Sequence, residues 1–171
     1  MWETIAGDAS AESALWADAL VPDRERRCEP VFSPLAPEEL GLGIETIYEG
    51  YLVHYGRPRL FAPVDDHTGL LLGDYLYAHG LVRIAETGNV AAVADLAELI
   101  SLCAQARAEG RPGDGAAWVA TASLLGADGL DVAREALRTD GDPTELEAAA
   151  RAAAGDAAVD SALAAHARLV G

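Results

Sequence analysis

The segment TGLLLGDYLYAHGLVRIA, Thr68–Ala85, decides the fold class of this chain. Its apolar residues occupy nearly every helical position, and Asp66 or Thr68 can cap its start, so the segment predicts one long helix. A helix on the surface of a globular protein has a single apolar stripe. Because this helix is apolar on almost every face, we expect it to be covered on both sides, by its own core and by a second surface such as another chain.

The rest of the sequence also favours helices. Aromatic residues make up only 6% of the 171 residues, alanine is frequent in the second half, and no β-branched run alternates with a period of two. Further helices are predicted over residues 37–54, 89–109 and 116–125, with Asn89 as one cap, and after the caps Asp142 and Asp156. The expected fold is an all-α helical bundle.

The first forty residues differ from the rest because four prolines fall close together there: Pro22, Pro30, Pro34 and Pro37. They predict an extended arm. One short helix, capped by Ser10 and built around Trp16, is expected within it. The expected organisation is therefore an N-terminal arm over residues 1–37 and a helical domain over residues 38–171.

The charge balance excludes two classes of partner. Twelve basic residues, all of them Arg, stand against 28 Asp and Glu residues, and the formal net charge is −16. Nucleic acids and anionic membrane surfaces both require a basic stripe on the protein that binds them. We therefore expect neither nucleic acid nor a membrane surface as a partner.

The cysteines and the termini indicate the compartment. Cys28 and Cys103 lie far apart, without the spacing of a disulfide framework or a zinc site. No apolar run reaches the length of a membrane span, and the first residues carry acids where a signal peptide carries basic residues. We expect a cytoplasmic protein with no integral membrane association.

No motif in the sequence predicts a catalytic residue. Asp65-Asp66-His67 is interpreted as ordinary helix capping, since adjacent side chains diverge. Glu45 and Glu49 lie four positions apart, which places two carboxylates on one helix face, a spacing that is routine on surface helices. The sequence contains no nucleophile elbow, no G-x-G-x-x-G and no P-loop.

The stretch GRPRLFAPVDDHTGLLLGDYLYAHGLVRIAE, Gly56–Glu86, resembles the middle of the trans-isoprenyl diphosphate synthases. Gly56-Arg57-Pro58 resembles the G-[RK]-P of that family, and Leu71–Leu76 resembles its L-x-G-D-x-L, at the family's usual spacing. The resemblance extends from Leu42 to about Ala127. It implies a truncated bundle of the isoprenoid-synthase type.

The elements that bind diphosphate in that family are altered here. Its first D-D-x-x-D motif falls at residues 45–49, so Glu45, Thr46 and Glu49 form a degenerate aspartate-rich motif. Enzymes of the family use these acids to bridge magnesium ions on an allylic diphosphate. The family's Lys-Thr pair reads Asp114-Gly115, and its second aspartate-rich motif has no counterpart. The resemblance implies no catalytic residue and no cofactor.

This pattern is similar to the small, non-catalytic subunits of bacterial heterodimeric polyprenyl diphosphate synthases. The resemblance implies a regulatory subunit that binds the catalytic synthase and helps to set the isoprenoid chain length. Two alternatives stay open. One is a degenerate prenyltransferase that acts on allylic diphosphates with magnesium held by Glu45 and Glu49. The other is a homodimeric helical interaction protein.

The candidate interface residues are Leu72, Tyr75, Tyr77 and His79, because they spread around the Thr68–Ala85 helix and some must face outward. With part of the helix that follows, they predict a subunit interface of roughly 1,600 Å². Glu45 and Glu49 are expected to be exposed helix acids, whose replacement by Ala costs well under about 2 kcal/mol.

Overall fold

The computed structural model describes residues 1–170, which form α-helices joined by turns and short 3-10 segments, with no strand among them. The helices are α1 (Trp2–Glu12), α2 (Ala14–Asp18), α3 (Gly41–Tyr55), α4 (Asp66–Glu86), α5 (Val90–Ala108), α6 (Asp114–Ser123), α7 (Asp131–Asp140), α8 (Thr144–Ala154) and α9 (Asp156–Val170). The predicted all-α fold is confirmed. None of the described helices is both long and apolar enough to cross a membrane.

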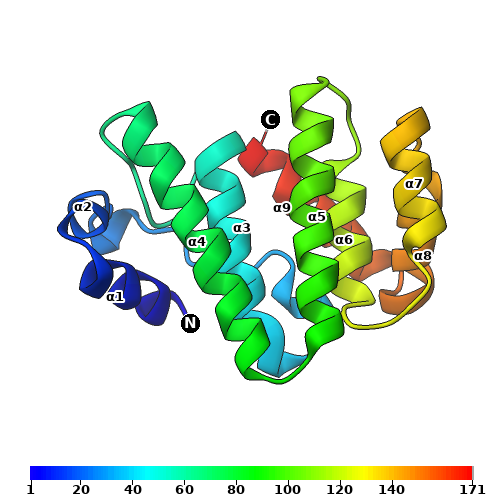
Figure 1. Cartoon of the computed structure of the whole chain (residues 1–171), viewed down its shortest axis with the longest axis horizontal. Coiled ribbons are helices and arrows are strands. Elements are labelled where there is room, and N and C mark those ends of the chain that lie inside the picture. The colour runs from blue at the N-terminus through cyan, green and yellow to red at the C-terminus, as the bar shows by residue number, and fades with distance from the viewer. Residues whose placement is uncertain (171) are drawn as a thin grey trace.

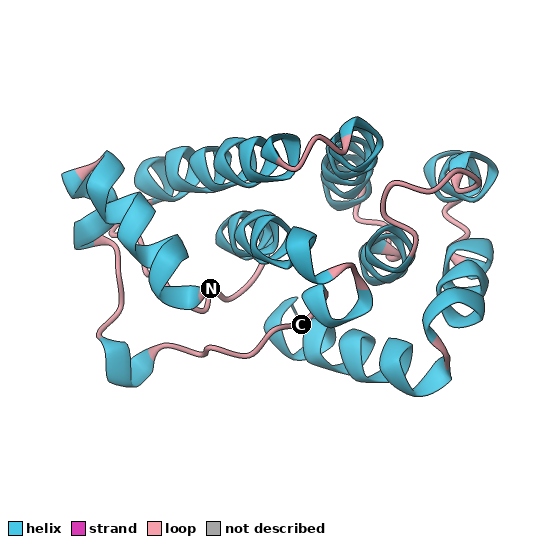
Figure 2. Ribbon diagram, turned by 90° about the horizontal axis from the view of Figure 1, so that it is seen from below, coloured by secondary structure: helices cyan, strands magenta, loops and turns pink. Residues whose placement is uncertain are grey.

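The helices form layers around α3. In Figure 1, α4 and α5 lie in front of α3, with α1 and α2 at one end of the molecule and α7 and α8 at the other. Figure 2 shows α3 almost end-on near the middle of the bundle, with α4 running along one side of it. This arrangement makes α3 the central helix and α4 an outer one.

Two of the long helices begin at capping side chains. The Asp65 carboxylate, rather than Asp66 or Thr68, caps α4 by accepting a hydrogen bond from the Thr68 N–H at 2.7 Å. The Asn89 side chain caps α5 as predicted, accepting from the Ala92 N–H at 3.0 Å. The Asp65-Asp66-His67 stretch thus serves as a helix start on an exposed surface.

Glycines allow α3 and α4 to pack with their backbones in close approach. A Cβ atom built at Gly80 would lie 2.4 Å from Ile47 Cγ1 and 3.0 Å from the carbonyl oxygen of Gly43. A Cβ atom at Gly50 would lie 2.9 Å from the carbonyl oxygen of Gly73. These separations are too short for any side chain, so the glycines of the GDYLYAHG run have a packing role.

The N-terminal segment contains two helices, where one was expected. Ser10 lies inside α1 and donates a hydrogen bond to the Ala6 carbonyl at 2.8 Å, whereas Ser13 is the residue that caps α2. Ile5 of α1 and Trp16 of α2 belong to a small second core that also contains Leu72 of α4. The segment is therefore not simply an extended arm, because its apolar residues cover one flank of α4.

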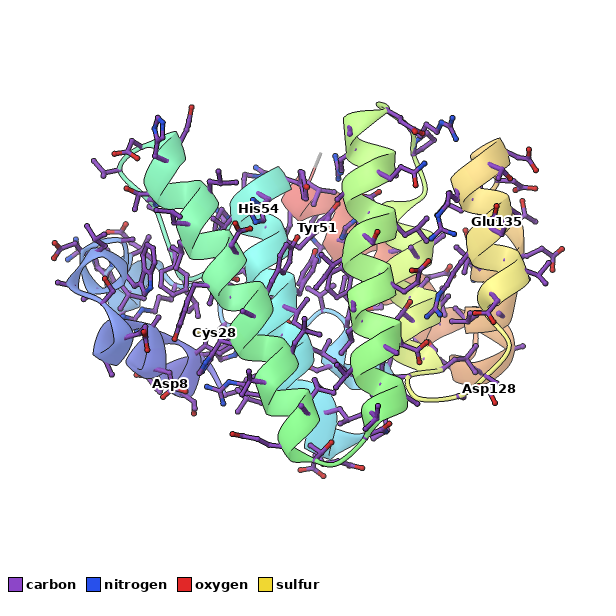
Figure 3. All side chains as sticks on the ribbon, viewed as in Figure 1. Asp8, Cys28, Tyr51, His54, Asp128 and Glu135 are labelled. Carbon is purple, nitrogen blue, oxygen red and sulfur yellow. The ribbon has the colours of Figure 1, made fainter. Side chains whose placement is uncertain are left out.

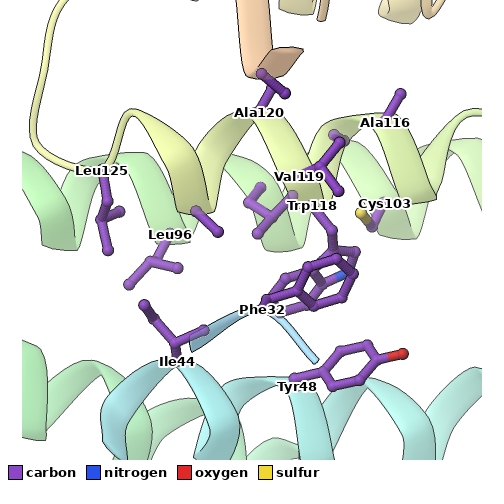
Figure 4. Packing of buried hydrophobic residues seen from close by; sticks show 14 of the residues in the cluster. Phe32, Ile44, Tyr48, Leu96, Cys103, Ala116, Trp118, Val119, Ala120 and Leu125 are labelled. Atoms are coloured by element: carbon purple, nitrogen blue, oxygen red, sulfur yellow. The ribbon is translucent and has the colours of Figure 1, made fainter. Parts of the chain in front are cut away.

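The main core lies between α3, α5 and α6 and includes a residue from the proline-rich segment. The Phe32 ring stacks on Trp118 at 5.0 Å between centroids and meets Tyr48 edge-on at 4.7 Å. Figure 4 shows Phe32 entering between α3 and α6, with Ile44 and Leu96 nearby. The segment around Phe32 is thus an integral part of the bundle.

Helix α7 was not predicted. Its sequence, DVAREALRTD, is rich in charged residues and buries only Ala133, Arg134 and Leu137. Its few apolar residues share one face, so the periodic signal is present, but the helix start lacks the capping side chain that marks the predicted helices. Helix α6 begins at Asp114, two residues before its predicted start.

Candidate functional site

Three charged side chains meet at the centre of the molecule, and we call them the Arg59 cluster: Arg59, Glu45 and Glu49. Both glutamates are 0% exposed on α3, and Arg59, from the loop after α3, is 2% exposed. Arg59 Nη1 lies 2.5 Å from Glu45 Oε2, and Arg59 Nε lies 2.9 Å from Glu49 Oε2. One guanidinium therefore bridges both carboxylates.

The remaining carboxylate oxygens hold loop backbone in place. Glu45 Oε1 accepts hydrogen bonds from three consecutive backbone N–H groups, those of residues 31–33, at 2.9 to 3.1 Å. Glu49 Oε1 accepts from the N–H groups of Arg59 and Leu60, both at 2.7 Å. The two acids thus fasten the proline-rich segment and the loop after α3 to the central helix.

Aromatic rings close the cluster off from water. The Arg59 guanidinium carbon lies 4.6 Å from the centroid of the Trp2 ring and 5.0 Å from that of Tyr48. Burial works against the positive charge, but Glu45 and Glu49 outweigh it and raise the pKa of Arg59 above its ordinary value. Arg59 is therefore an internal cation that contacts two aromatic rings as well as both glutamates.

The expectation that Glu45 and Glu49 are exposed helix acids is wrong. Both side chains are fully buried, and so is Thr46, whose hydroxyl donates to the Leu42 carbonyl at 2.7 Å. The physical reason is that Arg59 lies only ten residues beyond Glu49 and folds back against α3, where it supplies the opposite charge that burial of a carboxylate requires.

Magnesium does not fit these residues as they are arranged. The ion needs octahedral oxygen ligands and usually keeps several waters. Here every carboxylate oxygen of Glu45 and Glu49 already accepts from an N–H donor, and the Arg59 guanidinium lies between the two groups. Among residues 1–170, no group of three or more His, Cys, Asp and Glu side chains is placed to hold a metal ion.

A second polar network joins α3, α5, α6 and α9. The Tyr48 hydroxyl lies 2.9 Å from His166 Nδ1, and His166 Nε2 lies 3.4 Å from Asp114 Oδ2. The Tyr51 hydroxyl and the Arg107 guanidinium also donate to Asp114. Tyr51, labelled in Figure 3, projects from α3 toward α5. Sequence reasoning missed this network because its members lie far apart along the chain.

The environment of Asp114 favours its ionised form. Burial raises the pKa of this carboxyl, but the contacts of Asp114 with His166, Tyr51 and Arg107 outweigh burial and hold the pKa well below its usual range. Asp114 occupies the position where the resemblance expects a diphosphate-binding Lys-Thr pair. In this chain the position holds a half-buried ion pair between Asp114 and Arg107 instead.

The four candidate interface residues do not share one face of α4. Leu72 is 0% exposed and belongs to the second core, so it is not on the surface. Tyr75 stacks on His79 at 5.3 Å between centroids, and His79 Nε2 lies 3.4 Å from Asp8 of α1. Tyr77 lies on another flank. Tyr75, Tyr77 and His79 are all half-buried.

The apolar residues that α4 does expose are different ones. Leu71 is 58% exposed and Val82 is 53% exposed, and Ala78 between them is exposed as well. These three residues lie one above another on the helix, and we call them the outer α4 face. Sequence reasoning gave the right helix but not the residues that lie on its surface.

A cavity of about 360 Å³ lies beside the start of α4, with a lining that includes His54, Asp65 and Asp66. Burial lowers the pKa of His54, which Asp74 partly offsets. The two aspartates are exposed, and Asp65 is engaged in capping. The cavity therefore brings together no set of groups with a defined chemistry.

Comparison with known proteins gives no identification: no family model, no curated protein and no solved structure matches this chain. The similarity to isoprenoid synthases consequently depends on the quoted sequence motifs alone.

Proposed function

We propose that this chain is a non-catalytic subunit that binds a catalytic polyprenyl diphosphate synthase and helps to set the length of its isoprenoid product. The observation that carries the proposal is the Arg59 cluster. Glu45 and Glu49 stand at the position of the magnesium-binding acids in the family that the sequence resembles. Both are occupied by an internal guanidinium and by backbone donors.

The geometry at this position does not support chemistry on a diphosphate. A leaving diphosphate has to be neutralised by cations that it can reach. Arg59 is 2% exposed and already paired with two carboxylates, so it offers no free charge to a substrate. The buried polar side chains in the centre of the bundle pair with one another and with loop backbone, and in this way they connect its helices.

The outer α4 face supports the partner-binding part of the proposal. Leu71 and Val82 are each more than half exposed on α4, which is an outer helix of the bundle. Half-buried Tyr75 lies one helical turn from Leu71, and aromatic residues of this kind often dominate the energy of interfaces. A second copy of this chain is the competing occupant of the face, as the homodimer alternative requires.

An elongation assay tests the proposal. Farnesyl diphosphate, isopentenyl diphosphate and magnesium are supplied to the chain alone, to a prenyl synthase from the same cell, and to the two together. We expect no turnover by the chain alone and a changed product length for the mixture. Leu71→Asp, which places a charge on the outer α4 face, should return the product length to that of the synthase alone.

Turnover by the chain alone would contradict the proposal. An unchanged product with every candidate synthase, together with a stable dimer of the chain itself, would favour the homodimeric alternative instead.

A further inference from the structure

The arginines of this chain fall into two groups. Nine of the twelve form an ion pair with a described Asp or Glu: Arg24, Arg26, Arg59, Arg83, Arg107, Arg111, Arg134, Arg138 and Arg151. The other three, Arg27, Arg57 and Arg168, pair with no carboxylate among residues 1–170. In a chain with a formal net charge of −16, an arginine that forms no ion pair with a described carboxylate is the exception.

These three arginines lie together. The Arg57 guanidinium donates to the backbone carbonyl of Arg168 at the end of α9. The Arg27 N–H donates to the carbonyl of Arg59 at 3.1 Å, which brings the proline-rich segment to the same place. Arg27 and Arg168 both line one cavity, with Arg59 as part of its wall.

This cavity has a volume of about 130 Å³. Since one water takes about 30 Å³ of liquid volume, the space holds a small headgroup and a few further atoms. Val31, Ala165 and Leu169 form its apolar wall, and Glu29 is the one acid among its described lining residues. The cavity thus combines cationic and aliphatic groups in its lining.

We propose that this cavity binds a small organic oxyanion, a carboxylate or phosphate headgroup with a short aliphatic part. Guanidinium groups match carboxylates and phosphates with paired hydrogen bonds. Arg27 and Arg168 hold the headgroup, since both are exposed and have their charge available. Arg59 is neutralised by its two glutamates and shapes the wall without holding the ligand.

The apolar wall of the cavity recognises the second part of the ligand, its short aliphatic part. Val31 is 5% exposed and anchored by Glu45, so this part of the wall is rigid. Ala165 leaves room because its side chain is small. A larger residue at this position would fill the space while leaving every arginine in place.

Calorimetric titration of the isolated chain with sodium butyrate and with inorganic phosphate, in a zwitterionic buffer at low salt, tests the proposal. We expect saturable binding of at least one of the two anions. Arg27→Gln and Arg168→Gln should each weaken it by about tenfold or more, as expected for loss of a charge-assisted hydrogen bond. Arg24→Gln is the matched control, because it removes the same charge from the same segment outside the cavity.

Ala165→Phe separates the cavity from general electrostatics, and circular dichroism checks that each variant is folded. Binding should be lost in Ala165→Phe although all twelve arginines remain. Butyrate binding alone assigns a carboxylate ligand, and phosphate binding alone assigns a phosphorylated one. Absence of binding of both anions, an equal loss in Arg24→Gln, or full affinity in a folded Ala165→Phe would each overturn the proposal. The test needs no partner chain, so its outcome is independent of the proposed function.

Discussion

Two neighbouring helices, α3 and α4, break the usual burial rule in opposite ways. Helix α3 buries charged side chains, and α4 exposes large apolar ones. Helix α3 carries two glutamates that are 0% exposed, whereas α4 carries Leu71 and Val82 at 58% and 53% exposure. The glutamates are inside because Arg59 and backbone donors satisfy them. The apolar residues are outside because α1 covers only one flank of α4. The difference teaches that burial here follows the partners available in space more than the class of the residue.

The largest expected effect is at the centre of α3. Glu45→Ala leaves Arg59 short of a partner and removes the acceptor for three backbone N–H groups. We expect the free energy of unfolding to fall by about 3–5 kcal/mol, the cost of breaking a buried pair. Urea denaturation at neutral pH measures it.

Glu86→Ala provides the control, because Glu86 is an exposed acid at the end of α4. Its replacement should change the free energy of unfolding by less than about 0.5 kcal/mol. Equal losses for Glu45→Ala and Glu86→Ala would mean that Arg59 contributes nothing through its pairing with α3.

Adjacent leucines on α4 sharpen the same contrast. Leu72 is 0% exposed in the second core, whereas Leu71 is 58% exposed. Leu72→Ala should lower the free energy of unfolding of the isolated chain by about 2–5 kcal/mol, since it leaves a cavity. Leu71→Ala should change it by less than about 0.5 kcal/mol. Thermal unfolding of the two variants measures this difference. Similar losses of stability in both would place both residues in the core.

The smallest expected effect is a loss of folding stability at low pH. The folded-state pKa of Asp114 lies below that of the unfolded chain, so the unfolded state binds more protons in acid. The stabilisation from Asp114 is thus present above about pH 4 and lost as the pH falls below it, by about 1–2 kcal/mol. Unfolding free energies between pH 5 and about pH 2 should fall less steeply in Asp114→Asn.

Asp66→Asn is the control for that experiment. Asp66 is exposed, so the substitution removes the same charge without removing a buried hydrogen bond. Its acid dependence should follow that of the unaltered chain. The same steep fall in Asp114→Asn would assign the acid sensitivity to other carboxyls.

The sequence predicts the helices well where caps and periodic apolar residues coincide, as at Asn89 of α5. It fails where burial depends on a residue distant in the chain. Nothing in the spacing of Glu45 and Glu49 distinguishes an exposed pair from one bridged by Arg59. The helical pattern of α4 likewise contains no sign that α1 covers Leu72 and leaves Leu71 open.

Sedimentation velocity at micromolar concentration measures whether the outer α4 face binds another chain. The unaltered protein, mixed with a catalytic prenyl synthase from the same cell, should sediment as a complex. The double variant Leu71→Asp with Val82→Asp should remain folded, since both side chains are more than half exposed, and should sediment separately. A double variant that associates as well as the unaltered chain, or an unaltered chain that stays a monomer beside every such synthase, would contradict a role for this face in assembly.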